Sequence, residues 1–279
     1  ESTGETRIEK TSSTPDDPML AILNGIEQGG IDLSKVSMFS HGTTVATNAL
    51  IQRNLPRTAM ICTEGFRDVV EIRRANKEDL WDTYKDVAKP YVARRDRLVV
   101  KECVDANGMV IEALDEADAL RVAKVLKKRK VASVAICFMN SYTNGANEER
   151  MRDIMHSVMP DIPISISSQV LPEIFEHERF STTMANAVVS PVVVDYVERL
   201  EGNLADGGYE RDLLLLHTGG GVMTPASVKD FAARLAGSGI AAGAIASRFI
   251  GNLCGFDNSI GLELGGTHPA GSAGHMRTS

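Results

Sequence analysis

A glycine turn near the end of the sequence carries the strongest pattern for ligand chemistry. The apolar run 260–264 contains Glu263 and is followed by Gly265, Gly266 and Thr267. Glycines after a strand let backbone N–H groups turn toward a phosphate, because such loops use positive φ angles and close approach. The Thr267 hydroxyl can donate to a phosphate oxygen, and the Glu263 carboxylate can hold Mg²⁺ through water. A phosphate site and an ordinary turn explain the pattern equally well.

A second glycine turn follows the apolar run 213–217. It places Gly219, Gly220 and Gly221 directly after a strand-like segment. Three consecutive glycines suit a backbone loop that wraps around a ligand. A flexible turn before a helix that begins near Pro225 explains the same residues equally well.

A histidine and two threonines form the third candidate. The segment His41-Gly42-Thr43-Thr44 follows a short apolar run and opens a helix that we expect over 45–52. A helix N-terminus offers unpaired N–H groups to an anion or a carbonyl oxygen. Two alternatives stay open: Thr43 or Thr44 caps the helix, and His41 is a structural histidine.

One charged cluster has the spacing of a metal site but too few ligands. Glu173 and His177 would share one face of a helix at i,i+4 spacing. Two ligands do not make a metal site, so a solvated helix face is the favoured interpretation.

Strand-like and helical runs alternate around these candidates. Asp105-Ala-Asn-Gly108 separates two alternating runs and predicts a β-hairpin. Ser190-Pro191 is expected to interrupt the long helical run 172–204. The alternation predicts an α/β fold with a mixed sheet. We expect strands at 36–40, 58–63, 98–104, 109–113, 131–138, 163–167, 213–217 and 259–264, and helices ending near 28 and at 45–52, 66–74, 116–128, 147–158, 227–235 and 240–253.

Composition is that of an ordinary soluble globular chain. The sequence has 279 residues, of which 43% are hydrophobic and 24% charged. The longest apolar stretches fall far short of the about 18 residues that a membrane span needs. The net charge of −7 argues against a nucleic-acid partner, because phosphate neutralisation needs a basic face.

The four cysteines and the polar N-terminus point to a cytoplasmic protein. Cys62, Cys103, Cys137 and Cys254 lie far apart and show no metal-ligand spacing. Isolated thiols fit a reducing compartment. The first residues are polar and charged, unlike a secretory signal.

Several motifs together resemble a known family. They are Ser40-His-Gly-Thr-Thr-Val-Ala-Thr-Asn-Ala-Leu50, Thr63-Glu-Gly-Phe-Arg-Asp68, Ser167-Ser-Gln-Val-Leu-Pro-Glu-Ile174 with Glu178-Arg179, and Gly219-Gly-Gly-Val-Met223. In this order they resemble the hydantoinase A/5-oxoprolinase family, which includes the large subunits of acetone and acetophenone carboxylases. The resemblance runs from about Thr14 to Thr267.

The resemblance implies an α/β fold of the ribonuclease-H-like, actin-like ATPase superfamily, with the sugar kinases and heat-shock chaperones. These proteins clasp ATP between two lobes of mixed sheet and flanking helices. On this basis we expect residues 1–205 to form the hydantoinase/oxoprolinase N-terminal region. Residues 206–279 would begin the ATPase-like domain.

Departures from the family pattern lead us to expect an incomplete chain. The first phosphate loop, written DxGGTxTD, is absent, and Glu263 stands where the second loop usually has Asp. After Thr267 the sequence continues His268-Pro269-Ala270 instead of a small residue and Asp. We therefore expect a fragment that does not turn over ATP alone.

The resemblance implies ATP and Mg²⁺ as cofactors and gives roles to the candidates above. We expect the phosphates of ATP to be bound by Gly265, Gly266 and Thr267, and the metal to be held by Glu263. The nucleotide cleft would be shaped by Gly219, Gly220 and Gly221. The substrate carbonyl would be faced by His41, Thr43 and Thr44.

The implied activity is an ATP-dependent hydrolase subunit that activates a cyclic amide by phosphorylating its carbonyl oxygen. A ketone carboxylase subunit of the acetone or acetophenone type is the first alternative. A non-catalytic scaffold is an alternative of another class. A hydantoinase B-like second subunit is the expected protein partner.

Overall fold

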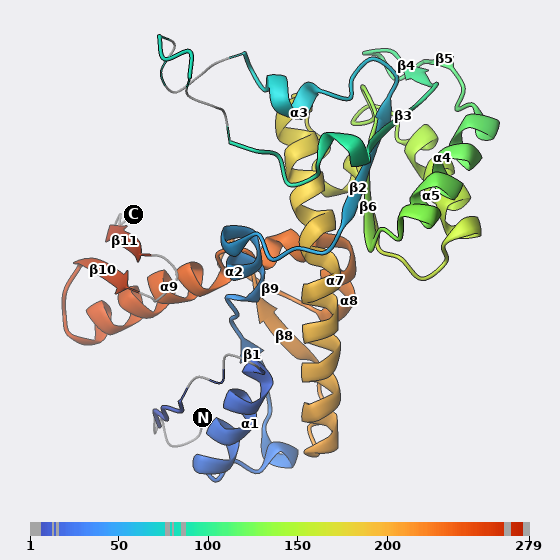
Figure 1. The fold of residues 1–279 in the computed structure, drawn as a ribbon. Coiled ribbons are helices and arrows are strands. Elements are labelled where there is room, and N and C mark those ends of the chain that lie inside the picture. Colours follow the sequence, from blue (N-terminus) through green and yellow to red (C-terminus); the bar gives the residue numbers. More distant parts are fainter. Residues whose placement is uncertain are drawn as a thin grey trace.

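The computed structural model describes residues 7–12, 14, 17–75, 79, 81–84, 88–264 and 269–275, of which 263–264 and 269–275 by backbone alone. The long helix α7 (Glu176–Asp206) runs through the middle of the molecule (Figure 1). Buried side chains occur on several of its faces, from Phe180 to Leu204. A helix that is buried all round belongs to the centre of a fold.

The predicted interruption of this helix at Ser190-Pro191 is wrong. The helix continues through Pro191 without a break. Proline removes one backbone N–H from the helical hydrogen-bond ladder. Val188, Val189 and Val193 are almost completely buried around the proline, so packing on both sides offsets that loss.

A four-stranded parallel sheet packs against the first half of α7. Its strand order is β3-β2-β6-β7. The strands are β3 (Arg97–Val100), β2 (Thr58–Thr63), β6 (Ser133–Cys137) and β7 (Ile164–Ile166), and the far face is covered by α4 (Glu116–Arg129) and α5 (Ala146–Val158).

Alternate residues of β2 enter two separate cores. Ala59 and Ile61 join the core under α4 and α5, whereas Met60 and Cys62 join the core around α7. Because both faces are covered, all six residues of β2 are buried. This explains the continuous apolar run in the sequence.

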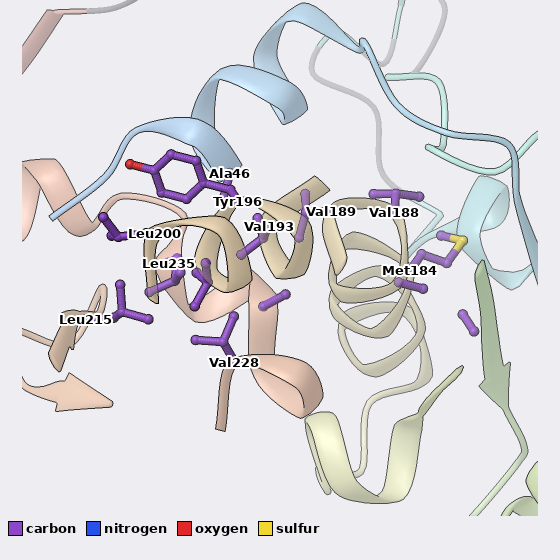
Figure 2. Close-up of a cluster of buried hydrophobic side chains, with 14 of the residues drawn as sticks. Ala46, Met184, Val188, Val189, Val193, Tyr196, Leu200, Leu215, Val228 and Leu235 are labelled. Atoms are coloured by element: carbon purple, nitrogen blue, oxygen red, sulfur yellow. The ribbon is translucent and has the colours of Figure 1, made fainter. Parts of the chain in front are cut away.

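A second, mixed sheet lies beside the other half of α7. Strand β1 (Phe39–His41) pairs in parallel with β8 (Leu213–Leu216), which pairs antiparallel with β9 (Val222–Met223). Figure 2 shows Tyr196 and Leu200 of α7 in the shared core, with Leu215 of β8, Val228 and Leu235. Around this sheet lie α1 (Pro18–Gln28), η1 (Leu33–Lys35), α2 (Val45–Gln52), α8 (Pro225–Phe231) and η3 (Ala232–Leu235).

The predicted hairpin is confirmed. Strands β4 (Cys103–Val104) and β5 (Val110–Glu112) pair antiparallel. The Asp105 carboxylate accepts from the N–H groups of Asn107 and Met109, at 2.9 and 2.8 Å. The remaining short elements are α3 (Val69–Ile72), η2 (Arg94–Asp96) and α6 (Ser167–Val170).

The last part of the chain projects away from the two sheets (Figure 1). Helix α9 (Ser238–Leu253) leads to a hairpin of β10 (Asn258–Leu264) and β11 (Pro269–His275) that packs back on the helix. The predicted strand at 259–264 is confirmed, and β11 was not expected from its small, polar residues. Over the part of the chain described here, none of the helices combines the length and apolarity that crossing a membrane requires.

The architecture confirms the predicted α/β class with mixed sheets and flanking helices.

Candidate functional site

The His41–Thr44 segment begins at the last residue of β1 and so lies at one end of the mixed sheet. His41 is the last residue of β1 and lies opposite Leu215 of β8. Thr44 is the N-cap of α2. The strand-to-helix turn expected from the sequence is therefore present, and its three candidate side chains lie together.

A serine on α9 holds this turn by its backbone. The Ser238 hydroxyl donates to the carbonyl oxygen of Thr43 at 2.6 Å and accepts from the Thr43 N–H at 3.2 Å. Nearby, the N–H of Gly237 donates to Thr47 Oγ1 at 2.8 Å. Ser238 is fully buried and Thr43 is 6% exposed. Two segments 195 residues apart in the chain are thus fixed to each other.

His41 is hydrogen-bonded to Tyr196 of α7. The Tyr196 hydroxyl lies 2.8 Å from His41 Nε2. Burial lowers the pKa of His41 from 6.5 to about 4, so the imidazole is neutral near pH 7. Burial also raises the pKa of Tyr196, and the nearby Thr43 side chain opposes that rise. Tyr196 and Ser238 were missed from the sequence, where each stands in an apolar or small-residue run with no motif around it.

The Gly219–Gly221 turn closes around the ring of His217. The N–H of Gly219 donates to His217 Nδ1 and the N–H of Gly220 donates to the His217 carbonyl, both at 2.9 Å. A Cβ at Gly219 or Gly221 would lie 2.8 Å from the imidazole, so neither position accepts a side chain without a shift. These two N–H groups are used inside the turn, so they are not free to donate to a ligand.

Thr218 attaches this glycine turn to the start of α9. Its N–H donates to the carbonyl of Arg234 at 2.8 Å, and its hydroxyl donates to the carbonyl of Ala236. Gly237, with φ +79°, then turns the chain into α9. The turn, α9 and the His41–Thr44 segment therefore meet in one place.

Two helix N-termini converge at this place. Within the described residues, neither N-cap residue, Thr44 of α2 or Gly237 of α9, makes a side-chain cap hydrogen bond, while Thr43 Oγ1 accepts from the Val45 N–H at 3.2 Å. A Cβ at Gly239 of α9 would lie 3.3 Å from the Thr44 side chain of α2, so the first turns are in contact. The first turn of a helix carries N–H groups without an intrahelical partner and the positive end of the helix dipole. Such an arrangement favours an anion or a polarised carbonyl oxygen.

The remaining predicted ligands fall at the limit of the described structure. Gly265, Gly266 and Thr267 lie outside the described residues. Glu263 lies in β10 opposite Ala270, and its side chain is not described. Among the residues that are described, no group of three or more His, Cys, Asp or Glu side chains could hold a metal ion.

The expected shared helix face of Glu173 and His177 is wrong. Helix α7 begins at Glu176, so Glu173 lies in the preceding loop. The carbonyl of Glu173 accepts from the buried guanidinium of Arg179 at 2.6 Å. His177 lies 3.4 Å from the Ser181 hydroxyl instead.

Family models match most of the sequence. The model of the hydantoinase/oxoprolinase N-terminal region matches residues 1–159, and the hydantoinase/oxoprolinase model matches residues 179–269. The chain belongs to the hydantoinase/oxoprolinase family. The predicted family is thereby confirmed.

Curated relatives extend the comparison over nearly the whole chain. An uncharacterized protein of Methanocaldococcus jannaschii is 33% identical over 94% of this chain and 39% of its own length. The caprolactamase subunit alpha of Pseudomonas jessenii is 31% identical over 95% of this chain and 39% of its own length. The acetophenone carboxylase gamma subunit of Aromatoleum aromaticum is 29% identical with the same two coverages. This hydantoinase/oxoprolinase chain spans about two fifths of the length of these relatives.

Solved structures agree with the sequence comparison. The crystal structure of ATP-dependent caprolactamase from Pseudomonas jessenii matches with a TM-score of 0.86 and 30% identity, over 97% of this chain and 40% of that chain. A nucleotide-free structure of acetone carboxylase matches with a TM-score of 0.79 and 24% identity, over 90% and 38%. The architecture is consistent with the predicted actin-like ATPase fold.

Proposed function

We propose that this chain is part of an ATP-dependent hydrolase subunit that opens a cyclic amide after its carbonyl oxygen has been phosphorylated. The observation that carries the proposal is the match to ATP-dependent caprolactamase, in which 97% of this chain is covered at a TM-score of 0.86. The site geometry supports it, because the N-termini of α2 and α9 meet beside His41.

ATP and Mg²⁺ would bind at the C-terminal side of this site. Gly265, Gly266 and Thr267 would contact the phosphates, and Glu263 would order Mg²⁺. The N-termini of α2 and α9 add N–H donors and positive dipole ends for the transferring phosphoryl group. Gly219, Gly220 and Gly221 would form the adjoining wall around His217.

His41 and Thr44 would face the carbonyl of the substrate. A neutral imidazole can donate one hydrogen bond to a carbonyl oxygen. It does not protonate that oxygen, so a lone pair of the oxygen stays free to attack the phosphoryl group. Thr43 is buried, so we assign it to positioning His41 and the turn rather than to direct contact.

The reaction balances with water as the second reactant. The lactam oxygen takes the γ-phosphoryl group of ATP and releases ADP. The C–O–P link makes the carbon a better electrophile for water. Cleavage of the C–N bond and loss of phosphate then give the ring-opened amino acid.

Ketone carboxylation is the second candidate. The acetophenone carboxylase gamma subunit matches 95% of this chain at nearly the same identity as the caprolactamase subunit. In that case the phosphorylated oxygen would be that of an enolate, and bicarbonate would supply the carboxyl carbon. His41 and Thr44 would face the same oxygen atom in both reactions.

The proposed enzyme is a hetero-oligomer of the cytoplasm. Several relatives are named as subunits, which supports a hydantoinase B-like partner. Cys62, Cys103, Cys137 and Cys254 are free thiols, as a reducing compartment requires. Within the chain, we place the boundary between the N-terminal region (1–205) and the ATPase-like region (206–279) at the end of α7.

Release of ADP by the chain assembled with its partner subunit tests the proposal. Caprolactam or 5-oxoproline should accelerate ADP release and give one ring-opened product per ADP. Stimulation by acetone or acetophenone, and only with bicarbonate, would support the carboxylase instead. A scaffold would neither release ADP nor gain stability from MgATP, whereas a true nucleotide site gains about 2.7 kcal/mol at a hundredfold excess over Kd.

A further inference from the structure

A cavity of about 430 Å³ lies where the two halves of the molecule meet. Its lining comes from α5 and β7 of the parallel-sheet half, from the central helix α7 and from α8 beside the mixed sheet. None of the residues assigned above to the candidate site lines it. Pockets for small molecules have volumes of about 300–1,000 Å³, so this cavity has the size of a second ligand site.

A buried hydroxyl in the lining has no partner within the protein. Ser190 of α7 lines the cavity and is 1% exposed, and its hydroxyl makes no hydrogen bond to any of the described residues. A serine inside a helix usually bonds a carbonyl of the preceding turn. A buried polar group without a partner is costly, so a ligand that bonds to this hydroxyl removes that cost.

Asn186, one turn before Ser190, fixes the walls around the cavity. Its amide nitrogen donates to Ser165 Oγ of β7 at 2.9 Å and to the carbonyl of Asp230 of α8 at 2.8 Å. Its amide oxygen accepts from the N–H of Ala233 at 2.9 Å. These bonds tie β7, α8 and η3 to α7, so the cavity is formed before a ligand enters.

The charged side chains of the lining do not neutralise one another. The Arg152 guanidinium of α5 donates to the neutral Gln169 side chain at 3.2 Å and makes no ion pair with a described residue. Asp161 and Asp230 line the same cavity, and neither carboxylate is hydrogen-bonded or ion-paired within the described part of the chain. The cavity therefore holds a cation and two carboxylates that each lack an ionic partner.

The remaining lining explains which cation is left for a ligand. Lys229 also lines the cavity, but it pairs with Glu198 at 2.8 Å. Ile164 of β7 and Val194 of α7 add apolar surface between the helices. Hydrocarbon atoms of a ligand would pack on that surface, and its charged groups would meet Arg152 and the two aspartates.

We propose that this cavity binds a zwitterionic amino acid. The ligand carboxylate accepts from the Arg152 guanidinium and the Ser190 hydroxyl. The ligand ammonium donates to the carboxylates of Asp161 and Asp230. An anion without an ammonium group would be repelled by the two aspartates, and a cation without a carboxylate would leave Arg152 unpaired.

The ring-opened product of a lactam is one member of this class. That link rests on the proposed function, because it takes the reaction as given. The site itself does not rest on it, since it is built from the cavity, the unpartnered hydroxyl and the separated charges.

Titration calorimetry of this chain, without ATP or lactam, tests the inference. The probes are 6-aminohexanoate and L-norleucine, two isomers that carry their charges at the chain ends or on neighbouring atoms. Hexanoate and hexylamine are matched controls that lack one charge. We expect at least one zwitterion to bind at a single site, and both controls to bind about tenfold more weakly or less, because each loses a charged hydrogen bond. Absence of binding by both zwitterions, or equal binding of hexanoate, would overturn the inference.

The variants give a pattern that general loosening of the fold would not produce. Arg152→Gln should bind the preferred zwitterion no better than the wild type binds hexylamine. Asp161→Asn combined with Asp230→Asn should bind it no better than the wild type binds hexanoate. Ser190→Ala should weaken it severalfold while the midpoint of urea unfolding does not fall, because the lost hydroxyl has no partner in the protein.

A second arginine of α5 supplies the control. Arg150 is exposed and pairs with Glu116 at 2.7 Å, outside the lining of the cavity. Arg150→Gln makes the same chemical change as Arg152→Gln and should bind the zwitterion as the wild type does. Equal weakening by both arginine variants, or wild-type binding in Arg152→Gln, would contradict the assigned carboxylate partner.

Failure of this inference and failure of the proposed function are distinguishable. A zwitterion that binds to a chain whose assembled enzyme turns over no lactam or ketone would keep the cavity site and remove the proposed function. ATP-dependent turnover by an enzyme whose chain binds neither zwitterion would do the reverse.

Discussion

Burial defines what His41 can do as a single residue. Its imidazole sits at the end of β1, in contact with Tyr196, and its pKa is lowered to about 4. A neutral ring at physiological pH cannot neutralise phosphate charge as a cation. It can donate one directed hydrogen bond, which suits a carbonyl oxygen more than a bare anion.

The pKa of His41 predicts a specific loss of stability in acid. The unfolded chain binds a proton on His41 near pH 6.5 and the folded chain only near pH 4. The unfolded state therefore holds more protons between these values, so this contribution is complete above pH 6.5 and is lost as the pH falls toward 4. Urea unfolding should show the wild type losing about 2 kcal/mol more than His41→Gln between about pH 7 and pH 4.5. Parallel pH profiles of the two proteins would show that His41 titrates normally.

Part of the site was predictable residue by residue, and part was not. His41, Thr43 and Thr44 stand in one short motif at a strand-to-helix turn, so the sequence alone brings them together. Tyr196 lies 155 residues from His41, and Ser238 lies 195 residues from Thr43. No local pattern encodes those contacts, because they depend on how α7 and α9 pack.

At the scale of elements, one serine joins the start of α9 to the strand-to-helix turn. Ser238→Ala removes both hydrogen bonds to the Thr43 backbone and leaves two buried backbone groups without their partner. We expect a loss of about 1–3 kcal/mol in the free energy of unfolding. Ser247→Ala lies on the same helix, at a side chain that makes no hydrogen bond to another described residue, and should change it by less than about 0.5 kcal/mol. Equal effects of the two changes in urea unfolding would contradict a specific role for Ser238.

The buried carboxylate of Glu148 joins the end of β6 to α6. Glu148 of α5 accepts from the N–H of Phe138 at 2.8 Å, the Ser167 hydroxyl at 2.6 Å and the N–H of Ser168 at 2.8 Å. Glu148→Gln would point an amide N–H₂ at one of these donors. Burial of the mismatch should cost about 1–3 kcal/mol, measured by urea unfolding.

The neighbouring exposed residue supplies the control. Glu149→Gln makes the same chemical change one position along α5, on the solvent side. It should leave the free energy of unfolding within about 0.5 kcal/mol of the wild type. A wild-type stability for Glu148→Gln would show that the carboxylate does not fasten β6 to α6.

The limits of prediction at this scale have physical causes. The hairpin at Asp105–Gly108 was predictable, because its turn is made by local hydrogen bonds. The continuity of α7 through Pro191 was not, because packing in the core around α7 outweighs the missing N–H. The Gly219–Gly221 turn was located correctly, but the need for glycine comes from the ring of His217.

Over the whole molecule, α7 ties both sheets into one framework. Its first half covers β2 and β6, and its second half shares a core with β8, α8 and η3 (Figures 1 and 2). The site lies where β1, the glycine turn and α9 meet on this second half. The α/β class followed from the alternation of strand-like and helical runs, whereas the two-sheet arrangement depends on long-range packing that the sequence pattern does not contain.

The central claim is that this place activates a carbonyl at the expense of ATP, and one comparison tests it most directly. ADP release and ring-opened product would be measured with caprolactam for the assembled enzyme carrying wild-type, His41→Ala or His156→Ala chains. His156 is exposed on α5, away from the site. We predict that His41→Ala lowers kcat about 100-fold or more with unchanged unfolding, because a positioned donor contributes on this scale, and that His156→Ala matches the wild type. Wild-type turnover in His41→Ala would contradict the assignment of this site.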